Sequence, residues 1–241
     1  MPPRLRFAPP STGCYWLHLT QRGNNKQPVF TADQDRHHFL TLVGSLSEER
    51  QVRVAAYTLM TNHFHLVAVG DQIDAISLVM MNLNGQYATY RHATQRTTGH
   101  VWQNRFYSCV LDDAHWQTAL GYVELNAVRA HLALSAGAYA WSSARAHLGR
   151  AKAPGWLDVD QFQQRWPTPA NWQESLATLT RREAADLRRA TRQDSALGSD
   201  TFIDHLERTH QIRLRAQPLG RPRKSPATAS AFPLPAQAST A

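Results

Sequence analysis

Apolar residues recur along this chain with two spacings, which predict an ordered series of strands and helices. Short runs rich in aromatic and branched residues predict strands at residues 14–20, 53–60, 63–69 and 105–111. Apolar residues three and four apart predict helices over residues 33–46, 73–90 and about 112–132. This order predicts an α+β fold, with a ferredoxin-like or RRM-like antiparallel sheet and helices on one face.

Individual residues mark the ends of several predicted elements. Thr31 is the predicted N-cap of the first helix, and Asp112 or Asp113 is that of the third. Thr61 and Asn62 separate the second and third strands and predict a hairpin between them, although this pair is not a strong turn signal. The third helix is predicted to bury one apolar stripe, formed by Trp116, Leu120, Val123 and Ala127.

The C-terminal part of the chain changes in character twice. Helical patterns predict a small helical appendage, with helices at residues 141–147, 159–165, 171–193 and 201–211. From Gln217 onward the chain has five prolines and no acidic residue, so a disordered tail is expected there. The predicted organisation is an arm (1–12), a main domain (13–150), the appendage (151–216) and the basic tail (217–241).

Charge favours an anionic partner, nucleic acid first, although a membrane surface stays open on charge alone. Lys and Arg number 26 against 18 Asp and Glu, which gives a formal net charge of +8 and a pI of about 10.0. No apolar run approaches the ~18 residues of a spanning helix, and the first residues lack a signal peptide's apolar centre, so a cytoplasmic protein is expected. Cys14 and Cys109 fit no metal pattern and are expected to be small core residues.

The strand predicted at residues 63–69 begins with the triplet His63, Phe64, His65. Side chains two apart in a strand point to the same face, so both imidazoles share one face and Phe64 faces the opposite layer. Two such imidazoles form a two-point metal site that lacks one or two oxygen ligands. In a chain with 12 histidines such a pair is often coincidental, and it needs corroboration.

Corroboration comes from the third predicted helix, where Tyr122 and Asn126 lie four residues apart on one face. Two imidazoles, an amide oxygen and open positions for phosphate oxygens suit Mg²⁺ or Mn²⁺ acting on a phosphodiester, and make a poor structural zinc site. A tyrosine beside such a metal can attack phosphorus as a phenolate. An isolated tyrosine there would simply be a half-buried helix aromatic.

Several motifs of the chain together resemble a known family. The strings YTLMTNHFHLVAV, GHVWQNRF, YVELNAVRAHL and WSSARAHLG, with the early RGN turn and DQDRHHFL, resemble the REP-associated tyrosine transposases, which are single-tyrosine HUH transposases. The resemblance covers residues 15–149. It implies that His63, His65 and Asn126 bind a divalent metal, Mg²⁺ or Mn²⁺, and that Tyr122 is the nucleophile.

The resemblance also shows departures from the family pattern. Thr61 stands where a proline is common, and Ala127 and His131 replace the usual proline and glycine after Asn126. No catalytic group is lost, so these departures concern fine geometry.

The resemblance further implies a reaction and a substrate. Tyr122 would nick single-stranded DNA, form a 5′-phosphotyrosine link and pass the strand to a new 3′-hydroxyl. The family's targets are hairpins of repetitive extragenic palindromes, which would place the protein at the bacterial nucleoid, and the family branch implies a monomer. The candidate DNA contacts are Arg22, Asn24, Arg91, Arg96, Trp102, Arg105, Arg129, Arg221, Arg223 and Lys224.

Some single residues carry open alternatives. For Arg22 and Asn24 a structural turn role is at least as favoured as DNA contact, and Trp102 can stack on a base or belong to the core. Phe106 is expected to be core, and Glu124 to be structural, pairing with Arg129 or Arg105.

Two other functions compete with the transposase. A catalytically idle, transposase-derived regulator would keep the fold and bind palindromic repeats without cutting them. A zinc-dependent hydrolase using the same histidines would need a third strong ligand and a general base, and the sequence has no HExxH motif.

Overall fold

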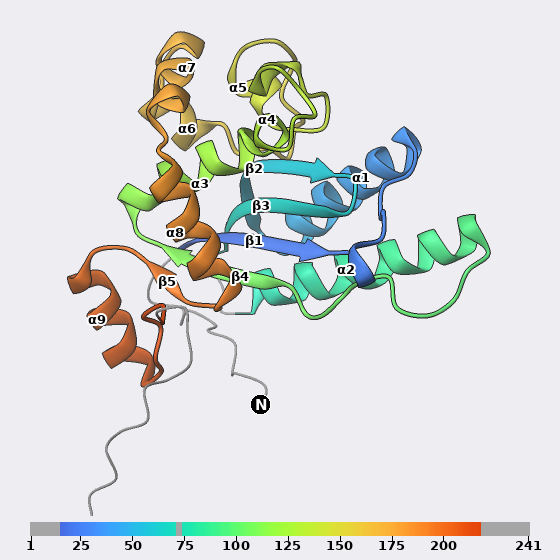
Figure 1. Ribbon diagram of the computed structural model, residues 1–241, viewed down its shortest axis with the longest axis horizontal. Helices are drawn as coiled ribbons and strands as arrows, with labels where there is room; N and C mark the ends of the chain where they lie inside the picture. Colours follow the sequence, from blue (N-terminus) through green and yellow to red (C-terminus); the bar gives the residue numbers. More distant parts are fainter. Residues whose placement is uncertain (1–14, 71–73, 218–241) are drawn as a thin grey trace, which may run out of the picture.

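The predicted series of elements is present in the computed structural model, which describes residues 15–70 and 74–217 (Figure 1). The strands are β1 (Trp16–Arg22), β2 (Val52–Met60), β3 (His63–Gly70), β4 (Tyr107–Leu111) and β5 (Ala196–Leu197). The helices are α1 (Asp33–Glu49), α2 (Ala75–Gln95), α3 (Asp113–Glu124), α4 (Asn126–Arg129), α5 (Ala144–His147), α6 (Asp160–Arg165), α7 (Pro169–Thr178), α8 (Arg181–Arg192) and α9 (Asp200–His210). Two 3-10 turns lie at Asn24–Lys26 and Ala136–Ala138.

The sheet has the strand order β2-β3-β1-β4-β5. The first four strands are antiparallel neighbours in the order that a ferredoxin-like fold requires, which confirms the α+β prediction. β5 pairs parallel to β4, with Ala196 opposite Val110, so the sheet is mixed and not purely antiparallel. A strand of two residues carries no periodic signal, which is why the sequence did not predict it.

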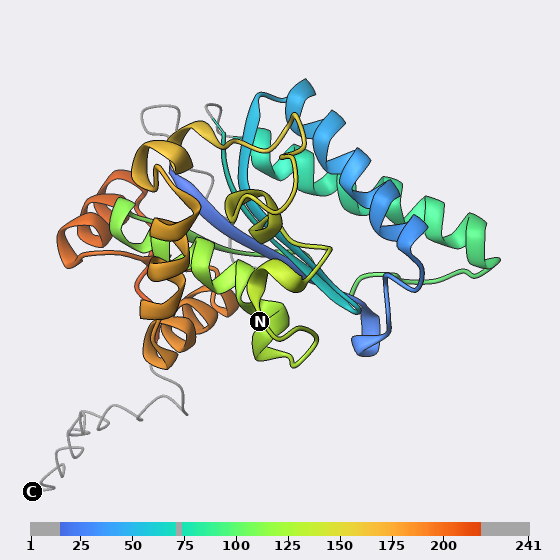
Figure 2. The ribbon, with the colours of Figure 1, turned by 90° about the horizontal axis from the view of Figure 1, so that it is seen from above.

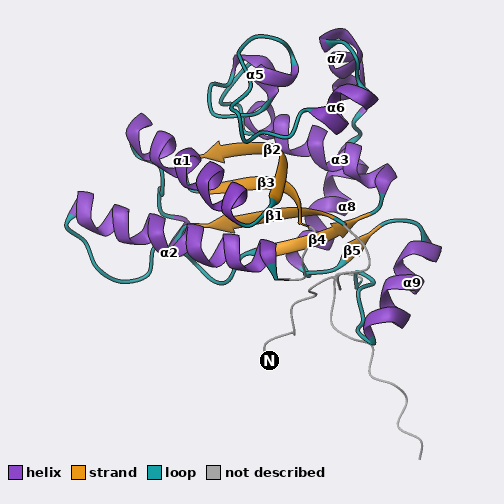
Figure 3. Ribbon diagram, turned by 180° about the vertical axis from the view of Figure 1, so that it is seen from behind, coloured by secondary structure: helices purple, strands orange, loops and turns teal. Residues whose placement is uncertain are grey.

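One face of the sheet is covered by α1 and α2, as predicted (Figure 3). Their apolar stripes bury Phe39, Met80 and Tyr87 against Phe64 and Leu66 of β3. Phe64 faces this layer, and its ring centroid lies 4.7 Å from that of Phe39. The strand alternation therefore sends His63 and His65 to the opposite face.

The opposite face of the sheet is also covered by helices, whose position the sequence did not predict (Figure 2). α3 packs on β2 and β3, and α8 packs on β4. Val67 and Cys109 of the sheet are buried in the same core as Trp116 of α3 and Leu187 of α8. The predicted appendage therefore contributes α8 directly to the second core.

Two long predicted helices are each divided. The helix predicted over residues 112–132 stops at Glu124 and resumes at Asn126, with Leu125 (φ −82°, ψ 1°) between them. The helix predicted over residues 171–193 is α7 followed by α8, because Thr180 caps α8 by accepting a hydrogen bond from the Glu183 amide at 3.1 Å. Asp112 caps α3 as predicted, by accepting from the His115 amide.

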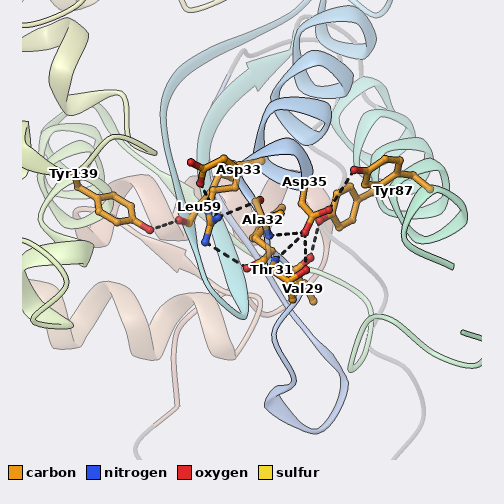
Figure 4. Close-up of polar contacts among 11 residues, drawn as sticks. Val29, Thr31, Ala32, Asp33, Asp35, Leu59, Tyr87 and Tyr139 are labelled. Carbon is orange, nitrogen blue, oxygen red and sulfur yellow. Dashed lines mark hydrogen bonds and ion pairs between the residues drawn. The ribbon is translucent and has the colours of Figure 1, made fainter. Parts of the chain in front are cut away.

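The start of α1 differs from the prediction in its capping residue (Figure 4). The N-cap is Ala32, and the Asp35 carboxylate accepts hydrogen bonds from the Thr31 amide (2.8 Å), the Thr31 hydroxyl (2.8 Å) and the Ala32 amide (2.9 Å). Burial raises the pKa of Asp35, but these hydrogen bonds outweigh it and hold the pKa below its ordinary value. Thr31 therefore donates to the Asp35 carboxylate and is not itself the N-cap.

The segment before α1 also holds the β2–β3 turn. The amides of Val29 and Phe30 both donate to the Thr61 carbonyl, at 2.8 and 3.0 Å, and the Tyr87 hydroxyl donates to the Val29 carbonyl at 2.6 Å. The turn that precedes His63 is thereby anchored to α2 through a single loop.

Some predictions fall outside the described residues. These are Cys14, the arm at residues 1–12, and the tail beyond Gln217 with Arg221, Arg223 and Lys224. Within the described residues, Cys109 is buried as expected. No helix there combines the length and apolar character that crossing a bilayer requires.

Candidate active site

A cavity of about 450 Å³ lies on the α3 and α8 side of the sheet. It brings together the four predicted site residues, His63 and His65 from β3, Tyr122 from α3 and Asn126 from α4. The complete lining is His18, Thr20, Arg22, His63, His65, Gln103, Tyr107, Tyr122, Asn126, Arg188, Thr191 and Arg192.

The two imidazoles of β3 each have one ring nitrogen engaged. The ring centroids of His63 and His65 lie 5.1 Å apart with planes at 84°. His63 Nδ1 lies 2.7 Å from Asn62 Oδ1, an acceptor, so His63 carries its proton on Nδ1. His65 Nδ1 lies 2.9 Å from His18 Nε2. In both rings it is therefore Nε2 that is left for a ligand.

Burial and nearby cations keep these imidazoles uncharged at neutral pH. Burial, with a smaller effect from the Arg22 charge, lowers the pKa of His63 to about 4. Burial, followed by the neighbouring His18 and His63, lowers the pKa of His65 well below 6.5. A metal ligand must be a neutral imidazole, so both rings are in the state that ligation requires.

Tyr122 is held beside these rings. It is 5% exposed, and its ring makes T-shaped contacts with His65 and His18, at 5.6 and 5.5 Å between centroids. The Arg129 guanidinium lies 4.2 Å over the Tyr122 ring and donates a hydrogen bond to the Tyr122 carbonyl. Arg129, which the sequence suggested as a DNA contact, is thus partly buried against the tyrosine.

Asn126 completes the group. Its side chain lines the cavity, and its buried Nδ2 has no hydrogen-bond partner within the described part of the chain. Among the described residues there is no cluster of three or more His, Cys, Asp or Glu side chains that could bind a metal. Two neutral imidazoles and the Asn126 amide oxygen are therefore the candidate ligands, a set that suits a divalent cation which also binds phosphate oxygens.

Several residues of the cavity were not predicted from the sequence. His18 interrupts an apolar run between Leu17 and Leu19, and a buried polar residue in such a strand is a signal that could have found it. Arg188, Thr191 and Arg192 come from α8, and nothing in their local pattern points to residues so distant in sequence. Tyr107, at the start of β4, places a second tyrosine in the cavity.

The predicted DNA contacts near the cavity fall into two places. Arg22 lines the cavity itself. Asn24, Trp102 and Arg105 line a separate depression of about 1070 Å³ between α2 and residues 99–106.

The other predicted contacts are engaged differently. Arg91 donates to the carbonyls of Val29 and Pro28, at 2.9 and 2.6 Å, so it ties α2 to the loop before α1. Arg96 is exposed at the left-handed C-cap of α2. Trp102 donates from Nε1 to the Asn84 carbonyl at 2.9 Å and packs on the core, and Phe106 is buried as expected.

Glu124 has a structural role, as predicted, but with other partners. Its carboxylate is fully buried and accepts hydrogen bonds from Ser143 Oγ (2.6 Å), His147 Nδ1 (2.5 Å) and Trp172 Nε1 (2.7 Å). Neither Arg129 nor Arg105 is among these partners. The cluster joins the end of α3, two residues after Tyr122, to α5 and α7.

Residues 12–126, just under half of the chain, match the family model for IS200-like transposases. Among solved structures, a REP-associated tyrosine transposase bound to a REP hairpin aligns at 16% identity with a TM-score of 0.52, over 64% of this chain and 89% of that chain. A putative transposase from Deinococcus radiodurans R1 aligns at 12% identity with a TM-score of 0.36, over 50% of this chain and 87% of that chain. No curated protein matches this chain.

Residues 12–126 are thus similar in sequence to the IS200-like transposases. The chain also shares the fold of a REP-associated tyrosine transposase, in agreement with the resemblance that its motifs indicate.

Proposed function

We propose that this protein nicks and rejoins single-stranded DNA by transesterification, with Tyr122 as the nucleophile. The observation that carries the proposal is the convergence of Tyr122, Asn126, His63 and His65 from three elements in one cavity. A regulator that does not cut has no need for this convergence.

The proposed reaction has one covalent step, used in both directions. Tyr122 Oη attacks phosphorus, the Oη–P bond forms and the P–O3′ bond breaks. The phenolic proton leaves to solvent in the open cavity, and the departing 3′ oxygen takes up a proton. The 5′-phosphotyrosine keeps the energy of the phosphodiester, so a second 3′-hydroxyl can reverse the step and join a new strand.

The residues around Tyr122 have distinct proposed roles. Arg129 holds the ring by stacking on it, and its positive charge favours negative charge developing on the oxygen. His63, His65 and Asn126 are proposed to hold Mg²⁺ or Mn²⁺, which when bound supplies Lewis-acid polarisation of the scissile phosphate. Within the described part of the chain no group of three His, Cys, Asp or Glu side chains supplies the ligands that a zinc hydrolase uses.

The proposed substrate is a hairpin of a repetitive extragenic palindrome. The structurally similar transposase is bound to a REP hairpin. The net charge of +8 also supports a nucleic-acid partner. At the cavity, Arg22, Arg188 and Arg192 are the proposed phosphate contacts.

The predicted DNA contacts that lie outside this cavity are also proposed. Asn24, Trp102 and Arg105 lie together at the second depression, where an unpaired base could stack. Arg96, and the tail residues Arg221, Arg223 and Lys224, remain proposed contacts to the DNA backbone.

We further propose that the protein acts as a monomer at the nucleoid in the cytoplasm. A dimeric mass in light scattering would contradict the monomer.

Cleavage of an end-labelled hairpin tests the proposal. The DNA is a palindromic hairpin from beside the coding sequence, incubated with Mg²⁺, Mn²⁺ or EDTA. Tyr122→Phe is compared with Tyr107→Phe, a matched control because Tyr107 lines the same cavity. We expect a metal-dependent nick that Tyr122→Phe abolishes and Tyr107→Phe retains. Binding without cutting under every metal would instead support the regulator.

A further inference from the structure

We propose that His18 and Thr191 form a hydrogen-bond relay that fixes the tautomer of His65, so that its Nε2 lone pair faces the metal position. This inference rests on the proposed function, because it concerns the ligand that His65 provides there. Thr191 belongs to α8, outside the segment that matches the transposase family.

The relay is a continuous series of short, buried contacts. His65 Nδ1 lies 2.9 Å from His18 Nε2, and His18 Nδ1 lies 2.8 Å from Thr191 Oγ1. The Thr191 hydroxyl lies 2.8 Å from the Leu187 carbonyl, one helical turn earlier. His18, His65 and Thr191 are 1%, 5% and 2% exposed, so water does not compete for these bonds.

The direction of each hydrogen bond follows from the group at the end of the relay, the Leu187 carbonyl. The Leu187 carbonyl can only accept, so the single hydroxyl proton of Thr191 is donated to it. Thr191 Oγ1 must then accept from His18, which places the His18 proton on Nδ1. With one proton on each ring, His18 Nε2 accepts from His65 Nδ1. Reversing any bond leaves two donors or two lone pairs facing each other.

The consequence falls on the free nitrogen of His65. Because Nδ1 carries the proton, Nε2 holds a lone pair. The relay also accounts for the third imidazole in the cavity, since both nitrogens of His18 are engaged. Ligand histidines commonly use a carboxylate or a carbonyl for this purpose, whereas here a second imidazole and a hydroxyl do so. His18 and Thr191 are therefore positioning residues.

The relay makes α8 part of the site. Thr191 acts through His18, because without the Thr191 hydroxyl His18 has no acceptor for its Nδ1 proton. His18 would then gain by moving that proton to Nε2, which reverses its bond to His65 and puts the His65 proton on Nε2. A change in α8 would thus block a ligand on β3.

The first test reads the tautomers directly in the metal-free full chain. Long-range ¹H–¹⁵N spectra of protein labelled at histidine distinguish a protonated Nδ1 from a protonated Nε2. We expect both His18 and His65 to carry the proton on Nδ1. A His65 protonated on Nε2 would overturn the relay, whatever the protein does to DNA.

The second test uses Thr191→Val and Thr191→Ser, with Mn²⁺ affinity measured by electron paramagnetic resonance. We expect Thr191→Val to bind Mn²⁺ about 10- to 100-fold more weakly, as for loss of an outer partner of a ligand, with its His65 proton moved to Nε2. Thr191→Ser keeps the hydroxyl and should restore both readings. Thr41→Val is the control, because Thr41 also donates to a carbonyl one turn earlier in a helix but belongs to α1, on the opposite face of the sheet.

The outcomes separate this inference from the proposed function. Wild-type affinity and an unchanged His65 tautomer in Thr191→Val would overturn the relay and leave the nicking reaction standing. Failure of the wild type to bind Mn²⁺ would count against the proposed metal site, while the tautomers of the metal-free protein would still decide the relay.

Discussion

The Arg129 guanidinium lies 4.2 Å over the ring of Tyr122 and also donates a hydrogen bond to the Tyr122 carbonyl. One side chain therefore fixes both the ring and the backbone of the proposed nucleophile. Leu125 interrupts the helix between them, and this break places Arg129 on α4, turned back over α3.

Arg129→Gln should slow the formation of the covalent protein–DNA adduct about tenfold, since a desolvated cation–π contact contributes up to ~2 kcal/mol. Hairpin affinity, measured by filter binding, should change little, because the Arg129 guanidinium is engaged with the ring and carbonyl of Tyr122. A normal rate of adduct formation with weakened DNA binding would contradict this prediction and would support the DNA contact that the sequence suggested for Arg129.

Arg188 and Arg192 are exposed, four residues apart on α8, and line the cavity. Replacing either residue by Ala should weaken hairpin binding for all DNA sequences. It should also reduce the slope of log affinity against log salt concentration by about 1, the value for one lost phosphate contact. Arg189→Ala is the control, because Arg189 pairs with Asp186 and does not line the cavity. An equal loss in all three variants would show a general charge effect.

The affinity of the proposed site for Mn²⁺ should change little between pH 7 and pH 5.5. Because the pKa of His63 is lowered to about 4 and that of His65 is lowered well below 6.5, both imidazoles stay unprotonated as the pH falls from 7 to 5.5. Two imidazoles with the ordinary pKa of about 6.5 would lose affinity by a factor on the order of 100 over this range. Calorimetric titration with Mn²⁺ at both pH values distinguishes the cases, and a loss of that size would contradict the lowered pKa values.

Much of this architecture could be predicted from the sequence, because its signals are local. Alternation in the strands and the helical stripes gave the first four strands and three main helices, and the spacing of His63 and His65 fixed their common face. The division at Leu125 was missed because the apolar stripe from Trp116 to Ala127 continues through it. Side-chain hydrogen bonds also override local preference, as Asp35 does at the start of α1.

The rest of the site depends on tertiary packing. His18 joins it only because β1 lies between β3 and β4, and α8 joins because β5 adds to the edge of the sheet beside β4. The partners of Glu124 come from α5 and α7, which no pattern near Glu124 indicates.

Glu124→Gln should destabilise the fold by about 2–4 kcal/mol, because it disturbs a buried carboxylate that accepts three hydrogen bonds. Urea unfolding measures the change, and Glu174→Gln, at an exposed position on α7, should stay within about 0.5 kcal/mol. Adduct formation per folded molecule should be retained, since Glu124 does not line the cavity. A stable variant that forms no adduct would give Glu124 a role in the chemistry.

The central claim is that Tyr122 forms the covalent bond to DNA. The most direct measurement digests the trapped protein–DNA adduct and identifies the modified peptide by mass spectrometry. We predict a nucleotide attached through its 5′-phosphate to Tyr122. A nucleotide on Tyr107, which lines the same cavity, or the absence of any adduct from a DNA that is cut, would contradict the account.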